Sequence, residues 1–112
     1  MAAGLKRGDV ITVVPPGDFG KPRPAVVVQS DWLNTNSSVL VAPLTSTMSD
    51  APLYRLTVEP SEANGLKLRS QIMVDKITPI LRVKCGAVVG ALDQATLIAL
   101  NNMLSVVIGI AD

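Results

Sequence analysis

Residues 9–28 read Asp9-Val-Ile-Thr-Val-Val-Pro-Pro-Gly-Asp-Phe-Gly-Lys-Pro-Arg-Pro-Ala-Val-Val-Val28. Two valine-rich runs flank the segment from Pro15 to Pro24, which holds four prolines and two glycines in ten residues. Proline has no N–H to donate to a strand ladder, so this segment is predicted to be a loop. Valine is β-branched and fits a pleated surface, so strands are predicted from Asp9 to Val14 and from Pro24 to Ser30.

The rest of the chain repeats this pattern of short apolar runs separated by turn residues. Valine accounts for 15 of the 54 hydrophobic residues, which favours a mainly β fold. Further strands are predicted at Ser38 to Leu44, Leu53 to Glu59, Ser70 to Lys76, Thr78 to Arg82 and Ala87 to Leu92. Polar loops are predicted at Thr45 to Pro52 and at Pro60 to Gly65. Seven short strands suffice to close a small barrel.

One amphipathic helix is predicted near the C-terminus. Asp93 is a suitable N-cap, and apolar residues recur at helical spacing over residues 94–108. These residues are Leu97, Leu100, Leu104, Val107 and Ile108, and the other side carries Ala95, Ala99, Met103 and Val106. Because apolar residues nearly encircle the helix, we expect it to bury a second surface, such as one provided by another subunit.

Length and composition narrow the possible functions. With 112 residues, the chain has the size of one domain spanning 1–112, and its formal net charge is only +1, so a nucleic-acid site must be a local patch. Histidine is absent, which excludes Ser-His-Asp triads, histidine-dependent ribonuclease chemistry and most zinc sites. Cys85 is the only cysteine, so an intrachain disulfide and a multi-cysteine metal site are excluded. We therefore expect no metal and no cofactor.

The sequence also predicts where the protein resides. Its longest apolar stretch, from Leu97 to Ile110, is interrupted by three polar residues and falls short of the roughly 18 unbroken apolar residues of a membrane span. The residues Met1-Ala-Ala-Gly-Leu-Lys6 lack a charged segment followed by an apolar one, so no secretion signal is expected. Together with the single cysteine, these features predict a cytoplasmic protein without a membrane partner.

Three blocks taken together resemble the MazF/PemK (Kid) toxins of bacterial type II toxin-antitoxin modules. They are Arg7-Gly-Asp-Val10, Lys21-Pro-Arg-Pro-Ala-Val-Val-Val28 and Ser70-Gln-Ile-Met-Val-Asp-Lys-Ile77. Their order and spacing match, and with the terminal helix the resemblance covers nearly the whole chain. It implies a small SH3-like barrel of the CcdB/PemK type with a C-terminal α-helix, and a homodimer. It also implies a metal-independent endoribonuclease that cleaves single-stranded RNA at short motifs and is neutralised by a cognate antitoxin.

RNA can be cleaved without histidine if the protein positions the substrate's own 2′-hydroxyl for in-line attack on phosphorus, while adding charge stabilisation and a proton relay. Arg23 is the best candidate for this task, because a guanidinium matches phosphate geometry and stays cationic. The resemblance implies that Arg23 is catalytic and that Thr45 is the second catalytic residue. The hydroxyl of Thr45 would hold a phosphate oxygen or orient a proton donor, and Ser46 or Thr47 can substitute for it in the alignment.

RNA binding is expected from a basic track above the barrel. The track consists of Lys21, Arg23, Lys67 and Arg69. It forms only if the loops that precede the second and fifth strands meet. Phosphate contacts of this kind supply affinity without reading the base sequence.

Ser70 and Gln71 are predicted to lie beside this track and to bind RNA with it. The amide of Gln71 reaches the same face or, by strand alternation, takes an inward structural role. Some members of the family have an acidic residue in the position of Ser70. In the family, an arginine accompanies this acidic residue. Either Arg69 takes over the role of that arginine here, or catalysis depends on Arg23 and Thr45 alone.

Two other functions remain open at this point. CcdB-like gyrase poisons have the same fold and typically end their last helix in Trp-Gly-Ile. This chain ends Val107-Ile-Gly-Ile-Ala-Asp112, which keeps Gly-Ile, lacks the tryptophan and adds two residues, so a gyrase poison ranks lower. The third reading is a non-catalytic SH3-like interaction module. Base preference depends on loop shape, which the sequence does not define.

Overall fold

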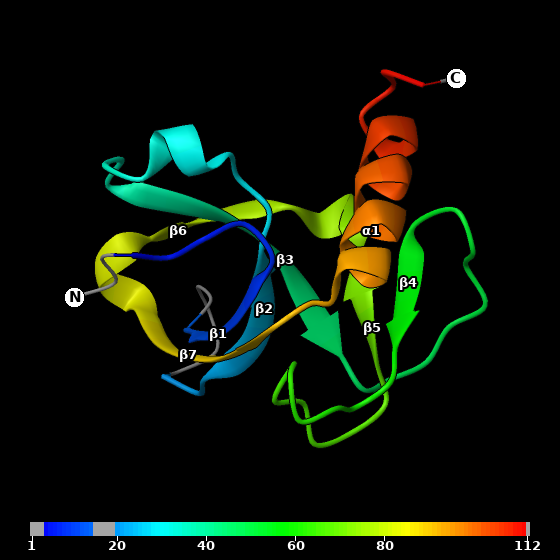
Figure 1. Cartoon of the computed structure of the whole chain (residues 1–112), viewed down its shortest axis with the longest axis horizontal. Coiled ribbons are helices and arrows are strands. Elements are labelled where there is room, and N and C mark those ends of the chain that lie inside the picture. The colour runs from blue at the N-terminus through cyan, green and yellow to red at the C-terminus, as the bar shows by residue number, and fades with distance from the viewer. Residues whose placement is uncertain (1–3, 15–19, 112) are drawn as a thin grey trace.

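The described residues, 4–14 and 20–111, form seven strands, three short 3-10 helices and one α-helix in this computed structural model. The strands are β1 (Asp9–Val13), β2 (Arg23–Val27), β3 (Ser38–Thr45), β4 (Arg55–Val58), β5 (Ser70–Met73), β6 (Thr78–Leu81) and β7 (Cys85–Ala91). The helices are η1 (Asp31–Leu33), η2 (Val74–Lys76), η3 (Arg82–Lys84) and α1 (Gln94–Val107). All the predicted strands and the predicted helix are present (Figure 1), and residues 15–19 of the first predicted loop lie outside the described residues.

The strands pair antiparallel in the order β4-β5-β3-β2-β1-β7, with β6 also paired to β3. The long strand β3 pairs with β6 over its first half and with β5 at its end, for example at Val41↔Thr78 and Leu44↔Ile72. These two registers differ by three residues, and η2 takes up the difference. The prediction of a strand from Ser70 to Lys76 is therefore wrong at its end, where residues 74–76 form η2.

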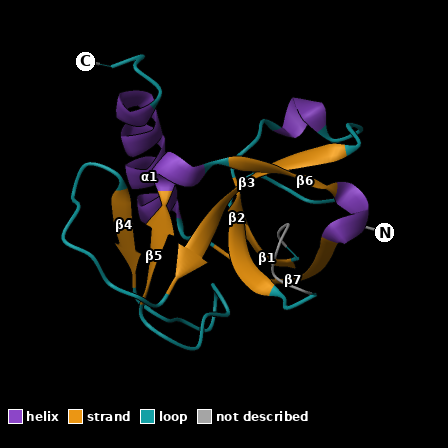
Figure 2. Ribbon diagram, turned by 180° about the vertical axis from the view of Figure 1, so that it is seen from behind, coloured by secondary structure: helices purple, strands orange, loops and turns teal. Residues whose placement is uncertain are grey.

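The predicted barrel is not closed by strand pairing in the described part of the chain. The strands β7, β1, β2, β3 and β6 curve around one core, but the chain passes from β6 to β7 through η3 instead of pairing them (Figure 2). The reason is that β4 and β5 extend the sheet toward α1 and do not complete the circle. The loop between β4 and β5 lies against β7, where Ala91 N donates a hydrogen bond to Ala63 O at 2.9 Å.

Two apolar cores form because successive side chains of a strand point to opposite faces. Core 1 contains Val10, Val26, Val28, Ala42, Leu44, Val58, Ile72, Val74, Leu92 and Leu100. Core 2 contains Leu5, Ile11, Val13, Ala25, Val27, Val39, Val41 and Ile80. The helix α1 covers core 1, whereas the curved strands enclose core 2. Adjacent residues of one strand therefore pack into different cores.

The helix α1 begins as predicted. The carboxylate of its N-cap, Asp93, accepts a hydrogen bond from Thr96 N at 2.7 Å, and hydrogen bonds from the Thr96 side chain and backbone lower the pKa of Asp93. Leu100 is fully buried in core 1, while Ile98 and Val106 on the other side remain about half exposed. The apolar outer side is therefore left uncovered in the single chain. None of the described helices is long and apolar enough to cross a membrane.

Candidate active site

The structure brings the two predicted catalytic residues to one cavity. Arg23 is the first residue of β2 and is exposed, and Thr45 is the last residue of β3 and is half-buried. The register of these strands pairs Ala25 with Pro43, and extending it by two residues sets Arg23 opposite Thr45. Both residues line a cavity of about 190 Å³ whose other walls are Val13, Val41, Pro43, Leu44, Met73, Thr78 and Ile80. The guanidinium of Arg23 and the hydroxyl of Thr45 therefore share a cavity with residues of core 2.

The hydroxyl of Thr45 is oriented by the loop that follows it. Its Oγ1 accepts a hydrogen bond from Thr47 N at 3.1 Å. A threonine hydroxyl has one proton and two lone pairs, so it can still donate to a phosphate oxygen. The Thr45 hydroxyl is therefore oriented, and its proton is still able to form a hydrogen bond.

Gln71 faces the same side of the sheet as Thr45, because the two residues are direct partners on β5 and β3. Its side chain is only 6% exposed, and its amide is bonded within the protein. Oε1 accepts from Ser49 N at 3.0 Å and from Arg55 Nη1 at 3.0 Å. Nε2 donates to Ser49 O at 3.0 Å and to Thr57 Oγ1 at 3.3 Å. Of the two roles that the sequence leaves open, these contacts favour the structural one.

Lys67 and Ser70 belong to a second cavity of about 420 Å³, which also involves Pro24 and Ser46. Pro24 follows Arg23 on β2, so strand alternation turns it to the opposite face of the sheet, and Ser46 follows the end of β3. The predicted site residues are therefore divided between two faces that meet at the ends of β2 and β3. The two predicted loops do approach each other there, since Lys67 and Pro24 line the same cavity.

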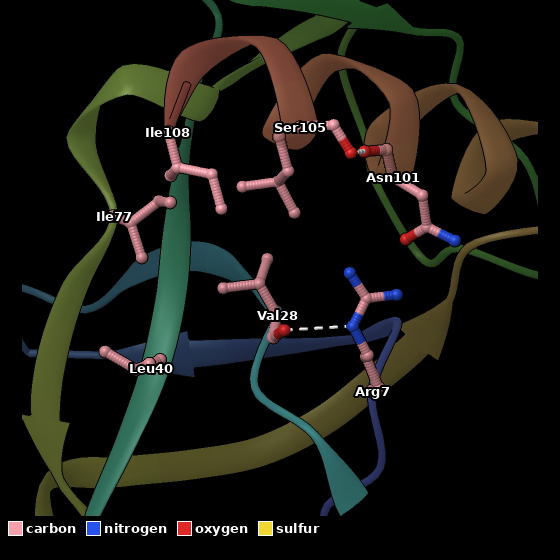
Figure 3. A pocket seen from close by; sticks show the side chains of 8 residues that line it. Arg7, Val28, Leu40, Ile77, Asn101, Ser105 and Ile108 are labelled. Atoms are coloured by element: carbon pink, nitrogen blue, oxygen red, sulfur yellow. Dashed lines mark hydrogen bonds between the residues drawn. The ribbon is translucent and has the colours of Figure 1, made fainter. Parts of the chain in front are cut away.

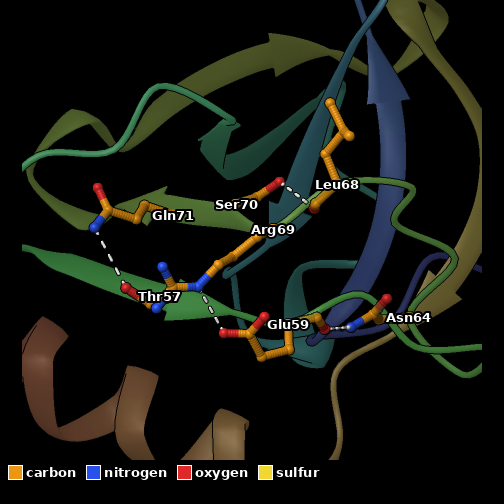
Figure 4. A network of polar contacts seen from close by, with 7 residues as sticks. All are labelled: Thr57, Glu59, Asn64, Leu68, Arg69, Ser70 and Gln71. Atoms are coloured by element: carbon orange, nitrogen blue, oxygen red, sulfur yellow. Dashed lines mark hydrogen bonds and ion pairs between the residues drawn. The ribbon is translucent and has the colours of Figure 1, made fainter.

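Ser70 and Arg69 diverge at the start of β5 (Figure 4). The hydroxyl of Ser70 is buried and donates to Leu68 O at 2.9 Å. The guanidinium of Arg69 turns toward Glu59 and forms an ion pair, with Nε 2.7 Å from Oε2. Both of these charged side chains are more than half exposed, so a phosphate has access to Arg69. Lys21 lies two residues before β2 and is exposed.

The sequence interpretation overlooked Arg55. It lies on β4, and its Nη1 donates to Thr47 O at 3.3 Å as well as to Gln71 Oε1. Its Nε is buried and has no hydrogen-bond partner among the described residues. A signal was present in the sequence, because Arg55 and Thr57 alternate with the apolar Leu56 and Val58 and so share one face of the strand.

Two further features, a larger cavity and the Cys85 thiol, are not part of the cavity lined by Arg23 and Thr45. A cavity of about 570 Å³ between α1 and the sheet is mainly apolar, and Arg7 Nε donates to Val28 O at its edge (Figure 3). None of the predicted site residues lines it. Burial raises the pKa of the Cys85 thiol, which the charge of Arg82 opposes, so the thiol is suited to packing. Among the described residues, no group of three His, Cys, Asp or Glu side chains is arranged to hold a metal ion.

Comparison with known sequences identifies relatives over nearly the whole chain. Residues 6–108 match the family described as PemK-like, MazF-like toxin of type II toxin-antitoxin system. A curated relative from Mycolicibacterium smegmatis, named probable endoribonuclease MazF, is 38% identical over 108 residues. The aligned region covers 96% of this chain and 99% of the relative.

Solved structures agree on the fold. An endoribonuclease from a mycobacterial species, solved with its cognate antitoxin, has a TM-score of 0.82 at 21% identity and covers 97% of this chain and 99% of its own. A MazE–MazF structure from Deinococcus radiodurans has a TM-score of 0.74 at 17% identity, with 96% and 97% covered. The predicted architecture, a mainly antiparallel β domain with one C-terminal helix, is thereby confirmed.

Proposed function

Because the chain belongs to the PemK-like, MazF-like toxins of type II toxin-antitoxin systems, we propose that it cleaves single-stranded RNA at short motifs, with the substrate's 2′-hydroxyl as nucleophile and without a metal ion. The observation that carries this proposal is the cavity shared by Arg23 and Thr45. The name of the curated relative, an endoribonuclease, supports the same reaction class.

The proposed reaction is a transesterification at phosphorus. The 2′-oxygen attacks the phosphorus in line, the bond to the 5′-oxygen breaks, and the products are a 2′,3′-cyclic phosphate and a free 5′-hydroxyl. The guanidinium of Arg23 stabilises the negative charge that develops on the phosphoryl oxygens. The hydroxyl of Thr45 is oriented by the hydrogen bond that it accepts from Thr47 N, and it donates to one of these oxygens. With no histidine in the chain, water receives the proton of the 2′-hydroxyl and protonates the leaving oxygen.

The RNA path is proposed to follow the ends of β2 and β3. Lys21 and Lys67 are exposed and contact phosphates, which supplies affinity but no sequence readout. Arg69 joins them by exchanging Glu59 for a phosphate. The buried hydroxyl of Ser70 and the bonded amide of Gln71 support the strand that carries them and leave the direct contacts to the cations.

Two protein partners are part of the proposal. The first is a second copy of the chain, because β7 and α1 each carry exposed apolar side chains, among them Val88, Ile98 and Val106. Light scattering is then expected to give about twice the chain mass of 11.8 kDa. The second is a cognate antitoxin, whose acidic, partly apolar segment folds against Lys21, Arg23 and Arg69 in the cytoplasm. One structural neighbour was solved with its own antitoxin, which supports this partner.

The proposal is tested with purified protein and a long RNA in the presence of EDTA, beside a gyrase supercoiling assay. Cleavage at recurring short motifs is expected, while gyrase remains active. The Arg23→Ala variant prepared in parallel excludes a contaminating nuclease, because it should lose cleavage while eluting identically. Gyrase inhibition without RNA cleavage would support the CcdB-like alternative, and the absence of both activities would leave a non-catalytic module.

A further inference from the structure

The loop from residue 46 to 54 is anchored by an internal amide. Gln71 accepts from Ser49 N and donates to Ser49 O, each at 3.0 Å, so its side chain pairs with both backbone groups of one loop residue, as a neighbouring strand would. The remaining donor of the amide is directed to Thr57 Oγ1 on β4 (Figure 4). Ser49 is thereby fixed to the sheet at a point four residues after Thr45.

Arg55 adds a second anchor to the same loop. Its Nη1 bridges Gln71 Oε1 and Thr47 O, so the guanidinium ties the amide to the residue whose N–H bonds Thr45. Its buried Nε has no partner in the described part of the chain, an arrangement that destabilises the fold. The guanidinium therefore links β4 to both the loop and the amide.

These contacts form a continuous path to the hydroxyl of Thr45. Gln71 and Arg55 hold the backbone at Ser49 and Thr47, and Thr47 N in turn donates to Thr45 Oγ1 at 3.1 Å. Without the anchors, the loop is free to rotate at Thr47, and the Thr45 side chain loses the bond that selects its rotamer.

We infer that Gln71 and Arg55 are positioning residues, which hold the loop so that Thr47 N aims the Thr45 hydroxyl into the cavity shared with Arg23. The inference rests on the proposed function, since Thr45 has a catalytic role only if this cavity cleaves RNA. Gln71 thus acts through Thr45 and makes no contact with the substrate itself.

Cleavage kinetics on a short RNA that contains a mapped site test the inference. Gln71→Met keeps the volume but removes every hydrogen bond, and it is expected to lower kcat by about 100-fold while KM changes less than about threefold. Arg55→Met leaves the Gln71–Ser49 pair intact, so a smaller loss of about tenfold is expected. Arg55→Met also removes the buried, unpaired Nε, so its fold is expected to be retained. Arg55→Met therefore tests the inference if Gln71→Met folds poorly.

Gln29 provides a matched control. It is also a buried glutamine, 8% exposed, and it ties Leu33 O and Leu40 N at the opposite end of the sheet with bonds of 3.1 and 3.2 Å. Gln29→Met therefore removes a similar anchor between residues that do not line the cavity, and it is expected to lower stability but to leave kcat unchanged. An equal loss of kcat in Gln29→Met would mean that general destabilisation explains the effect, and would overturn the inference.

A double-mutant cycle separates positioning from direct catalysis. If Gln71 acts through Thr45, adding Gln71→Met to Thr45→Ala lowers kcat by no more than about twofold further. A full 100-fold loss in the Thr45→Ala background would refute the inference.

Amide hydrogen exchange provides a readout that does not depend on RNA. Exchange at Ser49 and Thr47 is expected to quicken at least about tenfold in Gln71→Met and to stay unchanged in Gln29→Met. Unchanged exchange at both amides would overturn the anchoring, whether or not RNA is cleaved. A wild-type protein that does not cleave RNA would contradict the proposed function alone.

Discussion

The loop around residues 63–65 packs closely against β7, and glycine substitutions measure how much this contact stabilises the fold. Gly65 has a φ of +70°, and a Cβ at this position would collide with the carbonyl oxygen of Val89 on β7. Gly90 makes the same contact from the other side, where a Cβ would collide with the backbone of residues 63–64. Gly109 has a φ of +80° but nothing within 4 Å of a Cβ, so it isolates the conformational effect.

The magnitudes follow from these environments. Gly109→Ala places alanine in the left-handed region, which costs about 1 kcal/mol of unfolding free energy. Gly90→Ala forces two backbone segments apart, with an expected cost of about 1–3 kcal/mol. Gly65→Ala suffers both effects, so we expect about 2–4 kcal/mol. For a domain of this size, these values correspond to losses in Tm of about 4, 4–12 and 8–16 °C.

Urea and thermal unfolding at one fixed protein concentration provide the measurement, because association with a second copy would make Tm depend on concentration. The expected order of stability is Gly109→Ala above Gly90→Ala, with Gly65→Ala lowest. If Gly65→Ala is no less stable than Gly109→Ala, the loop does not pack against β7, and the close contact is refuted.

The effects of substitutions at three other positions are predicted. Arg23→Ala should lower kcat by about 100-fold or more with little change in Tm, and Arg23→Lys should recover only part of the rate; a variant that cleaves like wild type refutes the assignment. Asp93→Ala should lower Tm at neutral pH. Because the folded pKa of Asp93 is lowered, its stabilisation is present above the unfolded pKa, and the Tm difference should vanish as the pH falls through the folded value, in melts from pH 7 to 2. Burial raises the pKa of the Cys85 thiol, so Cys85 should react slowly with a thiol reagent at pH 7, and Cys85→Ala should cleave RNA normally.

The positions of the strands were predictable from local patterns. Valine runs with proline and glycine between them mark β1 and β2, and Asp93 with the spacing that follows marks α1, because the residues that determine these elements are adjacent in sequence. The three-residue difference in register that η2 takes up was not predictable. It results from β3 pairing with two strands in different registers, and a sequence does not show which registers meet.

Only part of the candidate site could be predicted from the sequence, and the catalytic roles of its residues remain predictions. Arg23 and Thr45 could be named as candidates because they match catalytic positions of the family that the sequence resembles, and the structure adds that both line one cavity. The bonding of Gln71 could not be foreseen, since its partner Ser49 lies 22 residues away and belongs to a loop without regular structure. The ion pair of Arg69 with Glu59 depends in the same way on the turn between β4 and β5.

The central claim is that the cavity of Arg23 and Thr45 cleaves RNA by means of the substrate's own 2′-hydroxyl. Its most direct test is an RNA oligonucleotide that contains a mapped site, compared in EDTA with the same oligonucleotide carrying a single 2′-deoxy nucleotide on the 5′ side of the cut. The account predicts a 2′,3′-cyclic phosphate and a 5′-hydroxyl from the first, and no cleavage of the second. Cleavage of the deoxy-substituted strand, or cleavage that EDTA abolishes, would contradict it.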